Sequence, residues 1–372
     1  MSKTVLFIRA NPVRPDSRVE KEVEALVAHG FNVTVLAWDR SENYPIRKEA
    51  LNDSLTAVDT YRIGIKAQFG SGIKNLKNLA KFQIAIRQFL RKNTFDVVHA
   101  CDFDTAFTAF HTINHKCTKF VYDIFDYYAH AFAIPPFLKG WVITNDRRII
   151  NGSDLTIICT EQRKEQIKGS SPKKLLVIHN SPPAVEVDEK IEGLNDTVRI
   201  AYFGILAEGR LIKELIDTVA HDSRFELHIG GFGLLENYVI EMANAYGSIK
   251  FYGKVPYRKV LEIEAKCDIM TAIYDPAVKN HLYAAPNKFY EALMLGKPVI
   301  MVKDTGMSEI VERNSFGMTI EYSKNGLQKG LDRVLVILKD KEKIRARMKD
   351  LYRDQYSWEE MSNRLITAYE AL

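Results

Sequence analysis

Residues 285–300 read APNKFYEALMLGKPVI, a stretch that predicts a helix start, a helix end and a buried strand in close succession. Pro286 suits the first turn of a helix, because its missing N–H removes no helical hydrogen bond. Gly296 suits the left-handed residue that ends a helix. The apolar, β-branched run at 299–302 then indicates a strand inside a sheet. The stretch therefore predicts a short helix that leads into a buried strand.

Glu291 falls within the first turns of this predicted helix. Free N–H groups at a helix start attract phosphate, and a carboxylate one turn further along accepts hydrogen bonds from sugar hydroxyls. Phosphate together with hydroxyls indicates a nucleotide sugar as the ligand. The alternative is a solvated helix with an ordinary surface glutamate, and the spacing alone does not separate the two.

The segment from Pro286 to Glu291, followed by 296–300, resembles the donor-site segment of retaining glycosyltransferases of family 4. That family carries two glutamates in this segment. The second matches Glu291, whereas Tyr283 stands at the position of the first. The resemblance implies an α/β protein of the GT-B fold, in which two Rossmann-like doubly wound domains face each other across a cleft. Further matching segments lie at 18–22, 96–102, 121–123 and 177–180.

Apolar strand patterns alternate with helical patterns in both halves of the chain, as in parallel α/β domains. The segment SPP at 181–183 and the polar stretch 186–197 interrupt the alternation and predict an interdomain linker. We therefore predict an N-terminal acceptor-binding domain over 1–182 and a nucleotide-sugar-binding domain over 196–354. The resemblance implies that a C-terminal helix at 355–372 packs back on the first domain. Strands are predicted at 5–8, 33–36, 97–99, 119–122, 155–159, 175–179, 198–204, 225–229, 249–252, 268–273, 299–302 and 318–320.

Length and composition fit a two-domain cytoplasmic protein. The chain has 372 residues, and 46% of them are hydrophobic and 27% charged, as in ordinary globular proteins. The apolar run at 5–8 is strand-sized and is followed by Arg9, so we expect no signal peptide. No run approaches the roughly 20 apolar residues that span a bilayer. The four cysteines lack CxxC spacing, which favours buried free thiols in a reducing cytosol.

The net charge of +5 is unevenly distributed, because residues 61–95 contain no acidic side chain. Part of this stretch predicts a helix with an apolar stripe. A basic amphipathic helix indicates an anionic membrane surface, so we expect a peripheral position on the inner face of the cell membrane. No nucleic-acid motif accompanies it. The alternative is a surface helix that packs its stripe on its own domain. The basic residues of the stretch are Arg62, Lys66, Lys74, Lys77, Lys81, Arg87, Arg91 and Lys92.

The resemblance also assigns donor contacts. In the family, a basic pair after a strand grips the donor diphosphate. Here Arg210 matches one member, Ile205 occupies the other position, and Lys288 is the expected replacement. The GGFG turn at 230–233 lacks the third glycine of a dinucleotide fingerprint, so it indicates a turn beside the nucleotide and no NAD site. The predicted nucleotide-sugar contacts are Gly204, Arg210, Gly231, Tyr257, Asn287, Lys288, Phe289 and Glu291.

The predicted catalytic residues are Asp126, His99 and Glu291. Relatives often carry a histidine where this chain has Phe125, so an acid such as Asp126 would have to serve. Carboxylates at strand ends also cap helices, which is the expected role of Asp104. No metal is expected: residues 102–104 have the letters DxD but precede a helix in the domain opposite the donor. By resemblance, cations and helix N–H groups meet the charge of the leaving diphosphate without a metal or other cofactor.

The leading prediction is a retaining glycosyltransferase that moves a sugar from a nucleoside-diphosphate sugar to a lipid-linked or oligosaccharide acceptor in the biosynthesis of bacterial surface polysaccharides. One alternative is a sugar-nucleotide 2-epimerase of the same fold. Another is a non-catalytic sugar-nucleotide-binding assembly partner, which the missing glutamate at Tyr283 and the missing histidine at Phe125 both favour.

Overall fold

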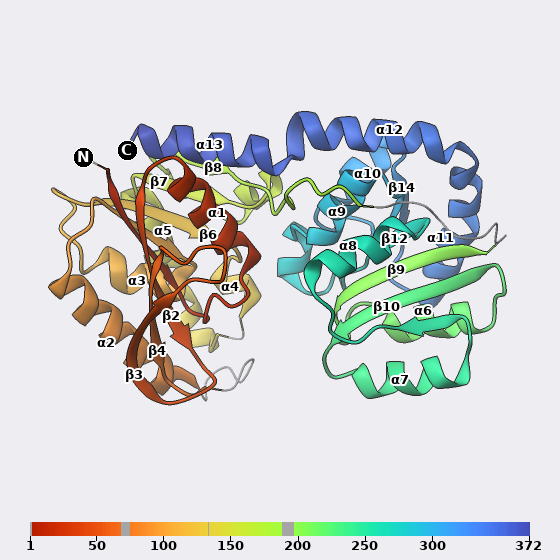
Figure 1. The fold of residues 1–372 in the computed structure, drawn as a ribbon, viewed down its shortest axis with the longest axis horizontal. Coiled ribbons are helices and arrows are strands. Elements are labelled where there is room, and N and C mark those ends of the chain that lie inside the picture. Colours follow the sequence, from red (N-terminus) through yellow and green to blue (C-terminus); the bar gives the residue numbers. More distant parts are fainter. Residues whose placement is uncertain (1, 68–74, 133, 188–196) are drawn as a thin grey trace. The chain divides into compact units, whose positions relative to one another are not determined.

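The computed structural model describes residues 2–67, 75–132, 134–187 and 197–372. Contacts divide the chain into two compact units, one formed by 1–179 with 362–372 and the other by 180–361. Each unit contains one sheet with helices packed against it (Figure 1). The predicted linker at 186–197 lies mostly outside the described residues.

The first unit is built on an eight-stranded sheet of order β3-β4-β2-β1-β5-β6-β7-β8. Its strands pair in parallel except for β3, which runs antiparallel to β4. The sequence did not predict β3 and β4. Strand β3 is a mostly exposed edge strand without an apolar run, and β4 is largely buried but has Arg62 among its apolar residues. The strands are β1 (Thr4–Arg9), β2 (Asn32–Asp39), β3 (Tyr44–Ala50), β4 (Asp59–Gly64), β5 (Val97–Cys101), β6 (Lys119–Ile124), β7 (Leu155–Ile158) and β8 (Leu175–Val177).

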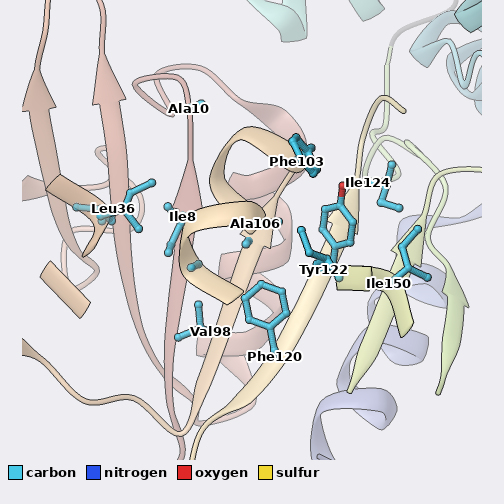
Figure 2. Packing of buried hydrophobic residues seen from close by; sticks show 14 of the residues in the cluster. Ile8, Ala10, Leu36, Val98, Phe103, Ala106, Phe120, Tyr122, Ile124 and Ile150 are labelled. Atoms are coloured by element: carbon cyan, nitrogen blue, oxygen red, sulfur yellow. The ribbon is translucent and has the colours of Figure 1, made fainter. Parts of the chain in front are cut away.

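Helices cover this sheet and bury its apolar strands. Figure 2 shows side chains from β2, β1, β5 and β6 packing toward the helix that carries Phe103 and Ala106. Helix α1 begins after Asp16, whose side chain accepts a hydrogen bond from the backbone N–H of Val19. The helices are α1 (Ser17–Ala28), α2 (Leu76–Lys92), α3 (Phe103–Phe110), α4 (Tyr128–Ala131), α5 (Pro136–Gly152) and the 3-10 segment η2 (Glu161–Glu165).

Residues 362–372 complete the first unit. They belong to α13 (Trp358–Glu370), which follows α12 (Lys341–Leu351) and a π-helical segment, η5 (Tyr352–Tyr356). The Tyr369 side chain is fully buried, and its hydroxyl oxygen lies 2.6 Å from Nδ1 of His99 on β5. The Phe31 ring meets the Tyr369 ring edge-on at 5.8 Å between centroids. The end of α13 is therefore part of the first unit's core.

The second unit contains a six-stranded parallel sheet of order β11-β10-β9-β12-β13-β14. Its strands are β9 (Val198–Ile205), β10 (Phe225–Phe232), β11 (Ile249–Phe251), β12 (Ile269–Ala272), β13 (Val299–Val302) and β14 (Gly317–Ile320). Its helices are α6 (Ile212–Ala220), α7 (Glu236–Ala245), α8 (Tyr257–Ala265), η3 (Lys279–Tyr283), α9 (Asn287–Leu295), α10 (Ser308–Asn314), α11 (Lys324–Ile337) and η4 (Leu338–Asp340). This is the doubly wound α/β architecture that the sequence predicts.

The stretch 285–300 has the predicted local structure. Helix α9 begins after Pro286, ends at Gly296 with φ of 66°, and is followed by β13. A side chain at Gly296 would also collide with Arg345, because an added Cβ would lie 2.4 Å from its Cγ. Glycine is therefore required at this helix end both by backbone conformation and by packing.

The borders between the units differ slightly from the predicted limits of 182 and 355. The Asn180 side-chain amide donates to the carbonyl of Ala285 at 3.0 Å, and the Tyr352 hydroxyl donates to the carbonyl of Pro182 at 2.7 Å. These bonds place residues 180–182 in the second unit, which continues to residue 361 within α13.

Two further properties concern the whole described chain. None of its helices is both long enough and apolar enough to cross a membrane. Cys101, Cys159 and Cys267 are buried free thiols, as expected, whereas Cys117 is exposed.

Candidate active site

Arg210 lies in the loop between β9 and α6. The backbone N–H of Asp275 donates to the carbonyl of Gly209 at 2.9 Å, which holds this loop against the segment that follows β12. The guanidinium carbon of Arg210 lies 4.2 Å from the centroid of the Tyr274 ring. No acidic side chain of the described residues pairs with Arg210. Its charge is thus held by an aromatic ring and is available to an anionic ligand.

Lys288, in the first turn of α9, points to the end of β9. Its ammonium lies 5.0 Å from the centroid of the Tyr202 ring, and an added Cβ on Gly204 would come within 2.7 Å of its Nζ. The side chain is 9% exposed, and no described residue forms an ion pair with it. Burial is the largest single effect and lowers the pKa of Lys288, but Tyr274, Tyr202 and the carboxylate of Glu291 together raise it above its ordinary value. Lys288 therefore stays charged in a buried position.

Arg210 and Lys288 lie close enough that the charge of Arg210 lowers the pKa of Lys288. The carboxylate of Glu291 also acts on Lys288, but no described acid forms an ion pair with either cation. Two cations held near each other repel, and a bound anion with more than one charge relieves this repulsion. Both side chains rest on tyrosine rings at the carboxyl ends of neighbouring strands, where parallel sheets bind ligands. The arrangement fits a diphosphate. The sequence did not identify Tyr202 and Tyr274 as its supports.

Glu291 lies one turn after Lys288 on α9 and is 4% exposed. The hydroxyl of Tyr257, the first residue of α8, donates to its Oε1 at 2.9 Å. This bond between neighbouring helices fixes the direction of the carboxylate. The predicted contacts Lys288, Glu291 and Tyr257 are thus brought together, with Arg210 beside Lys288.

Gly204 and Gly231 face each other in the register of β9 and β10. Gly231 has a φ of 134°, and an added Cβ would lie 1.7 Å from the carbonyl oxygen of Gly204. Close strand packing therefore explains Gly231, while its contact with a nucleotide stays a prediction. Gly204 is explained by a different contact: a side chain at this position would displace the ammonium of Lys288.

The remaining predicted donor residues separate into exposed and buried ones. Asn287 is exposed at the start of α9, where a ligand can reach it. The prediction for Phe289 is wrong: its side chain is fully buried against Tyr290 and Tyr356, and its backbone N–H donates to a carbonyl of the chain. Tyr283 ends η3 in a partly exposed position, and its contact with a sugar stays a prediction.

Asp126 lies just after β6, at the carboxyl end of the first unit's sheet. Its side chain is 48% exposed, and its Oδ1 accepts a hydrogen bond from Nη2 of Arg163 at 3.0 Å. The adjacent Phe125 ring packs against the guanidinium groups of Arg9 and Arg18, at 4.1 and 4.9 Å. Asp126 is therefore an accessible acid on a fixed loop. The sequence analysis overlooked Arg9 and Arg163, although Arg9 directly follows the first strand.

Asp102 shapes the loop that carries Asp126. Its Oδ1 accepts hydrogen bonds from the backbone N–H groups of Phe125 and Asp126, at 2.9 and 3.1 Å, and its Oδ2 accepts one from Arg9. Its φ of 65° is unusual for a residue with a side chain and indicates a backbone held by these contacts. Burial raises the pKa of Asp102 to about 7, although Arg9 opposes the shift.

The prediction that His99 is catalytic is wrong, because no part of its side chain is exposed. The ring stacks on Phe7 at 4.1 Å, and Tyr369 covers Nδ1. Burial is the main cause that lowers its pKa, so the ring is neutral. A residue enclosed in this way cannot touch a substrate.

Nε2 of His99 points toward a buried pair of acids, lying 3.5 Å from Asp123 and 3.8 Å from Glu22. Three such side chains could hold a metal ion. However, the guanidinium of Arg18 already lies 3.0 Å from Asp123 and 3.1 Å from Glu22. The cluster is therefore a structural ion pair with its own cation.

Only part of the basic stretch 61–95 is exposed to solvent. The prediction for Arg62 is wrong: its side chain is 2% exposed and donates to Glu49 and to backbone carbonyls. The alternative for the apolar stripe of α2 is correct, since Phe82, Ile86 and Phe89 lie in the core of the first unit. Lys74 lies outside the described residues. The cations that remain exposed are Lys66, Lys77, Lys81, Arg87, Arg91 and Lys92.

Family models match both halves of the chain. A model of Glycosyltransferase Family 4 matches residues 17–181, and a model of Glycosyl transferases group 1 matches residues 197–354. No curated protein matches the chain in a sequence search.

Solved structures show the same fold. Sucrose-phosphate synthase from Thermosynechococcus elongatus is similar with a TM-score of 0.76 at 15% identity, over 99% of this chain and 98% of that one. HepE from Anabaena in complex with UDP-glucose has a TM-score of 0.66 at 14% identity, over 100% of both chains. The lipopolysaccharide outer core galactosyltransferase WaaB has a TM-score of 0.66 at 15% identity, over 99% of both chains. The family models and the shared fold together show that this chain is a family 4-like glycosyltransferase of the GT-B fold.

Proposed function

We propose that the enzyme transfers a sugar, with retention at the anomeric carbon, from a nucleoside-diphosphate sugar to a lipid-linked acceptor. The observation that carries the donor assignment is the pair of cations without an acidic partner, Arg210 and Lys288, beside the oriented carboxylate of Glu291. HepE, which has the same fold, is solved in complex with UDP and with UDP-glucose. A nucleotide sugar offers diphosphate oxygens to the cations and hydroxyls to the carboxylate.

The chemistry requires that the bond between the sugar and the diphosphate break while negative charge develops on the leaving oxygen. Arg210, Lys288 and the N–H groups at the start of α9 stabilise that charge. We propose that no metal ion is needed, because two fixed cations meet the diphosphate. Asp126, the accessible acid on the first unit's sheet, is proposed as the catalytic acid that this unit supplies.

The direct test is a thermal-shift screen against UDP-, GDP-, ADP- and dTDP-sugars. A ligand at 100 times its dissociation constant stabilises the folded protein by about 2.7 kcal/mol, which is readily measured. Release of nucleoside diphosphate that depends on an acceptor would support transfer. Conversion of the donor into its 2-epimer without net release of nucleoside diphosphate would instead indicate an epimerase, and binding with neither reaction would indicate a non-catalytic binder. A chain that none of these donors stabilises would contradict the proposal.

The proposal of a lipid-linked acceptor rests on apolar side chains at the surface of the first unit. Phe137 on α5 is 83% exposed, Phe132 is 50% exposed and Trp141 is 49% exposed. Helix α3 packs against both α2 and α5, so α5, which carries Phe137 and Trp141, and α2, which carries the cations, lie next to the same helix (Figure 1). Exposed aromatic rings beside cations are typical of surfaces that bind anionic membranes.

Replacing Phe137 by serine is expected to weaken sedimentation with anionic vesicles roughly tenfold, since burying a phenylalanine contributes about 1.5–3 kcal/mol. Changing Lys77, Lys81, Arg87 and Arg91 together to glutamine removes about 1 kcal/mol for each cation at low salt. The matched control is Val336→Ser, which removes an exposed apolar side chain from α11 in the second unit. Sedimentation that is indifferent to anionic lipid and salt would leave α2 as an ordinary surface helix.

A further inference from the structure

Glu264, near the end of α8, is a buried acid that the reaction as described does not use. Its side chain has no exposed surface, and neither carboxyl oxygen has a hydrogen-bond partner among the described residues. Its helix neighbours Leu261, Ile263 and Ala265 are also buried. An ionised carboxylate without a partner in such a place is very unfavourable. The geometry therefore requires a neutral carboxylic acid at this position.

The surroundings of Glu264 connect it to the donor site. Tyr257 lies two turns earlier on α8 and donates to Glu291, so α8 contacts the donor carboxylate directly. From α9, the charge of Glu291 adds to burial in raising the pKa of Glu264, and the ammonium of Lys288 acts against both. Burial is the main cause that raises the pKa of Cys267, just after α8, and of Tyr257, and an ionised Glu264 would raise both further. Tyr352 on η5 also contributes to raising the pKa of Tyr257.

The two acids, Glu264 and Glu291, have different environments. Glu291 receives a hydrogen bond from Tyr257, whereas Glu264 receives none. Two carboxyl groups that share a buried region do not both ionise readily, and the one without donors keeps its proton. The charge assignment is therefore an ionised Glu291 and a protonated Glu264.

We propose that Glu264 is a positioning residue of the donor site: its neutral carboxyl keeps a second negative charge away from Lys288 and Arg210, and its ionisation weakens diphosphate binding. The inference rests on the proposed function, since it concerns the same donor. The cations then face the diphosphate with one opposing carboxylate, that of Glu291. Loss of the Glu264 proton adds a second negative charge near Lys288, which reduces the attraction of the cations for the diphosphate.

The test is the affinity for UDP, measured by calorimetry from about pH 6 to about pH 10. If the donor screen selects GDP, ADP or dTDP, that nucleotide is used instead. We expect wild-type affinity to fall about tenfold at alkaline pH as Glu264 ionises. The variant Glu264→Gln keeps the shape and the neutral charge, so it should match wild type at low pH and retain affinity at high pH. Glu262→Gln is the matched control on the same helix, where the acid is 38% exposed, and it should follow wild type.

Infrared spectroscopy gives a readout that does not depend on ligand. Other buried acids with a raised pKa, such as Asp102, also contribute protonated carboxyl bands, so the readout is a difference spectrum at neutral pH. A protonated carboxyl band should appear in the difference between wild type and Glu264→Gln and be missing from the difference between wild type and Glu262→Gln. The pH dependence of the free energy of unfolding should agree with the infrared result. Because folding raises the pKa of Glu264, the free energy of unfolding declines as pH rises from the ordinary glutamate range to the raised value. Glu264→Gln should remove that decline.

The outcomes separate this inference from the proposed function. Identical pH profiles for wild type and Glu264→Gln, or weak binding by Glu264→Gln at every pH, would overturn the role of Glu264. If Glu264→Gln does not fold, Glu264→Met replaces it in the difference spectrum, and the absence of a protonated carboxyl band from that difference would overturn the assignment. Failure of the wild-type protein to bind any of the four nucleotides would contradict the proposed function, while the infrared test would still decide the protonation state.

Discussion

Replacing Glu291 by alanine is expected to reduce glycosyl transfer by at least a hundredfold while the protein stays folded. The carboxylate is 4% exposed and is oriented by the Tyr257 hydroxyl, so it offers fixed acceptor oxygens to hydroxyls of the donor. Each hydroxyl left without an acceptor in a closed site costs about 1–3 kcal/mol, and a ribose presents two. The measurement is kcat/KM for the donor found in the thermal-shift screen, with circular dichroism to check the fold.

The control for Glu291→Ala is Glu309→Ala, which removes an exposed glutamate on α10. It should leave kcat/KM unchanged. Near-normal turnover by Glu291→Ala would remove the basis for placing the donor at the start of α9.

Arg210→Ala and Lys288→Ala are each expected to weaken UDP binding by at least tenfold and to leave uridine binding nearly unchanged. The two cations have no acidic partner among the described residues, so their charge is available to the diphosphate. A hydrogen bond to a charged group contributes about 1.5–3 kcal/mol, and uridine has no phosphate with which to form one. Calorimetric titration with UDP and with uridine checks both expectations.

Lys303→Ala is the matched control for these two variants, because Lys303 is an exposed cation of the same unit and pairs with Glu321 at 3.1 Å. It should bind both ligands as wild type does. Equal losses for UDP and uridine in Arg210→Ala or Lys288→Ala would mean that the side chain does not bind phosphate.

The local signals in the sequence were sufficient for the fold. Pro286, Gly296 and the run at 299–302 predict a helix and a strand because each depends on backbone conformation or on a short apolar pattern. The other parallel strands, except β4, were found for the same reason. Strand β3 was missed because an exposed edge strand has no such pattern, and β4, which is largely buried, was missed because Arg62 interrupts its apolar residues.

The site was harder to predict, because burial depends on residues far away in the chain. His99 follows a strand and has a reactive side chain, but Tyr369 covers it from 270 positions away. Arg62 carries the charge expected of a surface, yet Glu49 and the carbonyl of Pro12 enclose its guanidinium. Helical spacing could have excluded Phe289, since Lys288 and Glu291 lie one turn apart and Phe289 points elsewhere.

The split composition of the first unit affects its biosynthesis. A ribosome completes the unit at 180–361 before it adds residues 362–372, which belong to the core of the first unit. Until Tyr369 is made, Nδ1 of His99 lacks its partner and the Phe31 ring lacks its neighbour. The domain whose translation begins first can therefore complete its core only after the whole of the second unit has been translated, and a protein ending at residue 179 would expose this part of its core to aggregation.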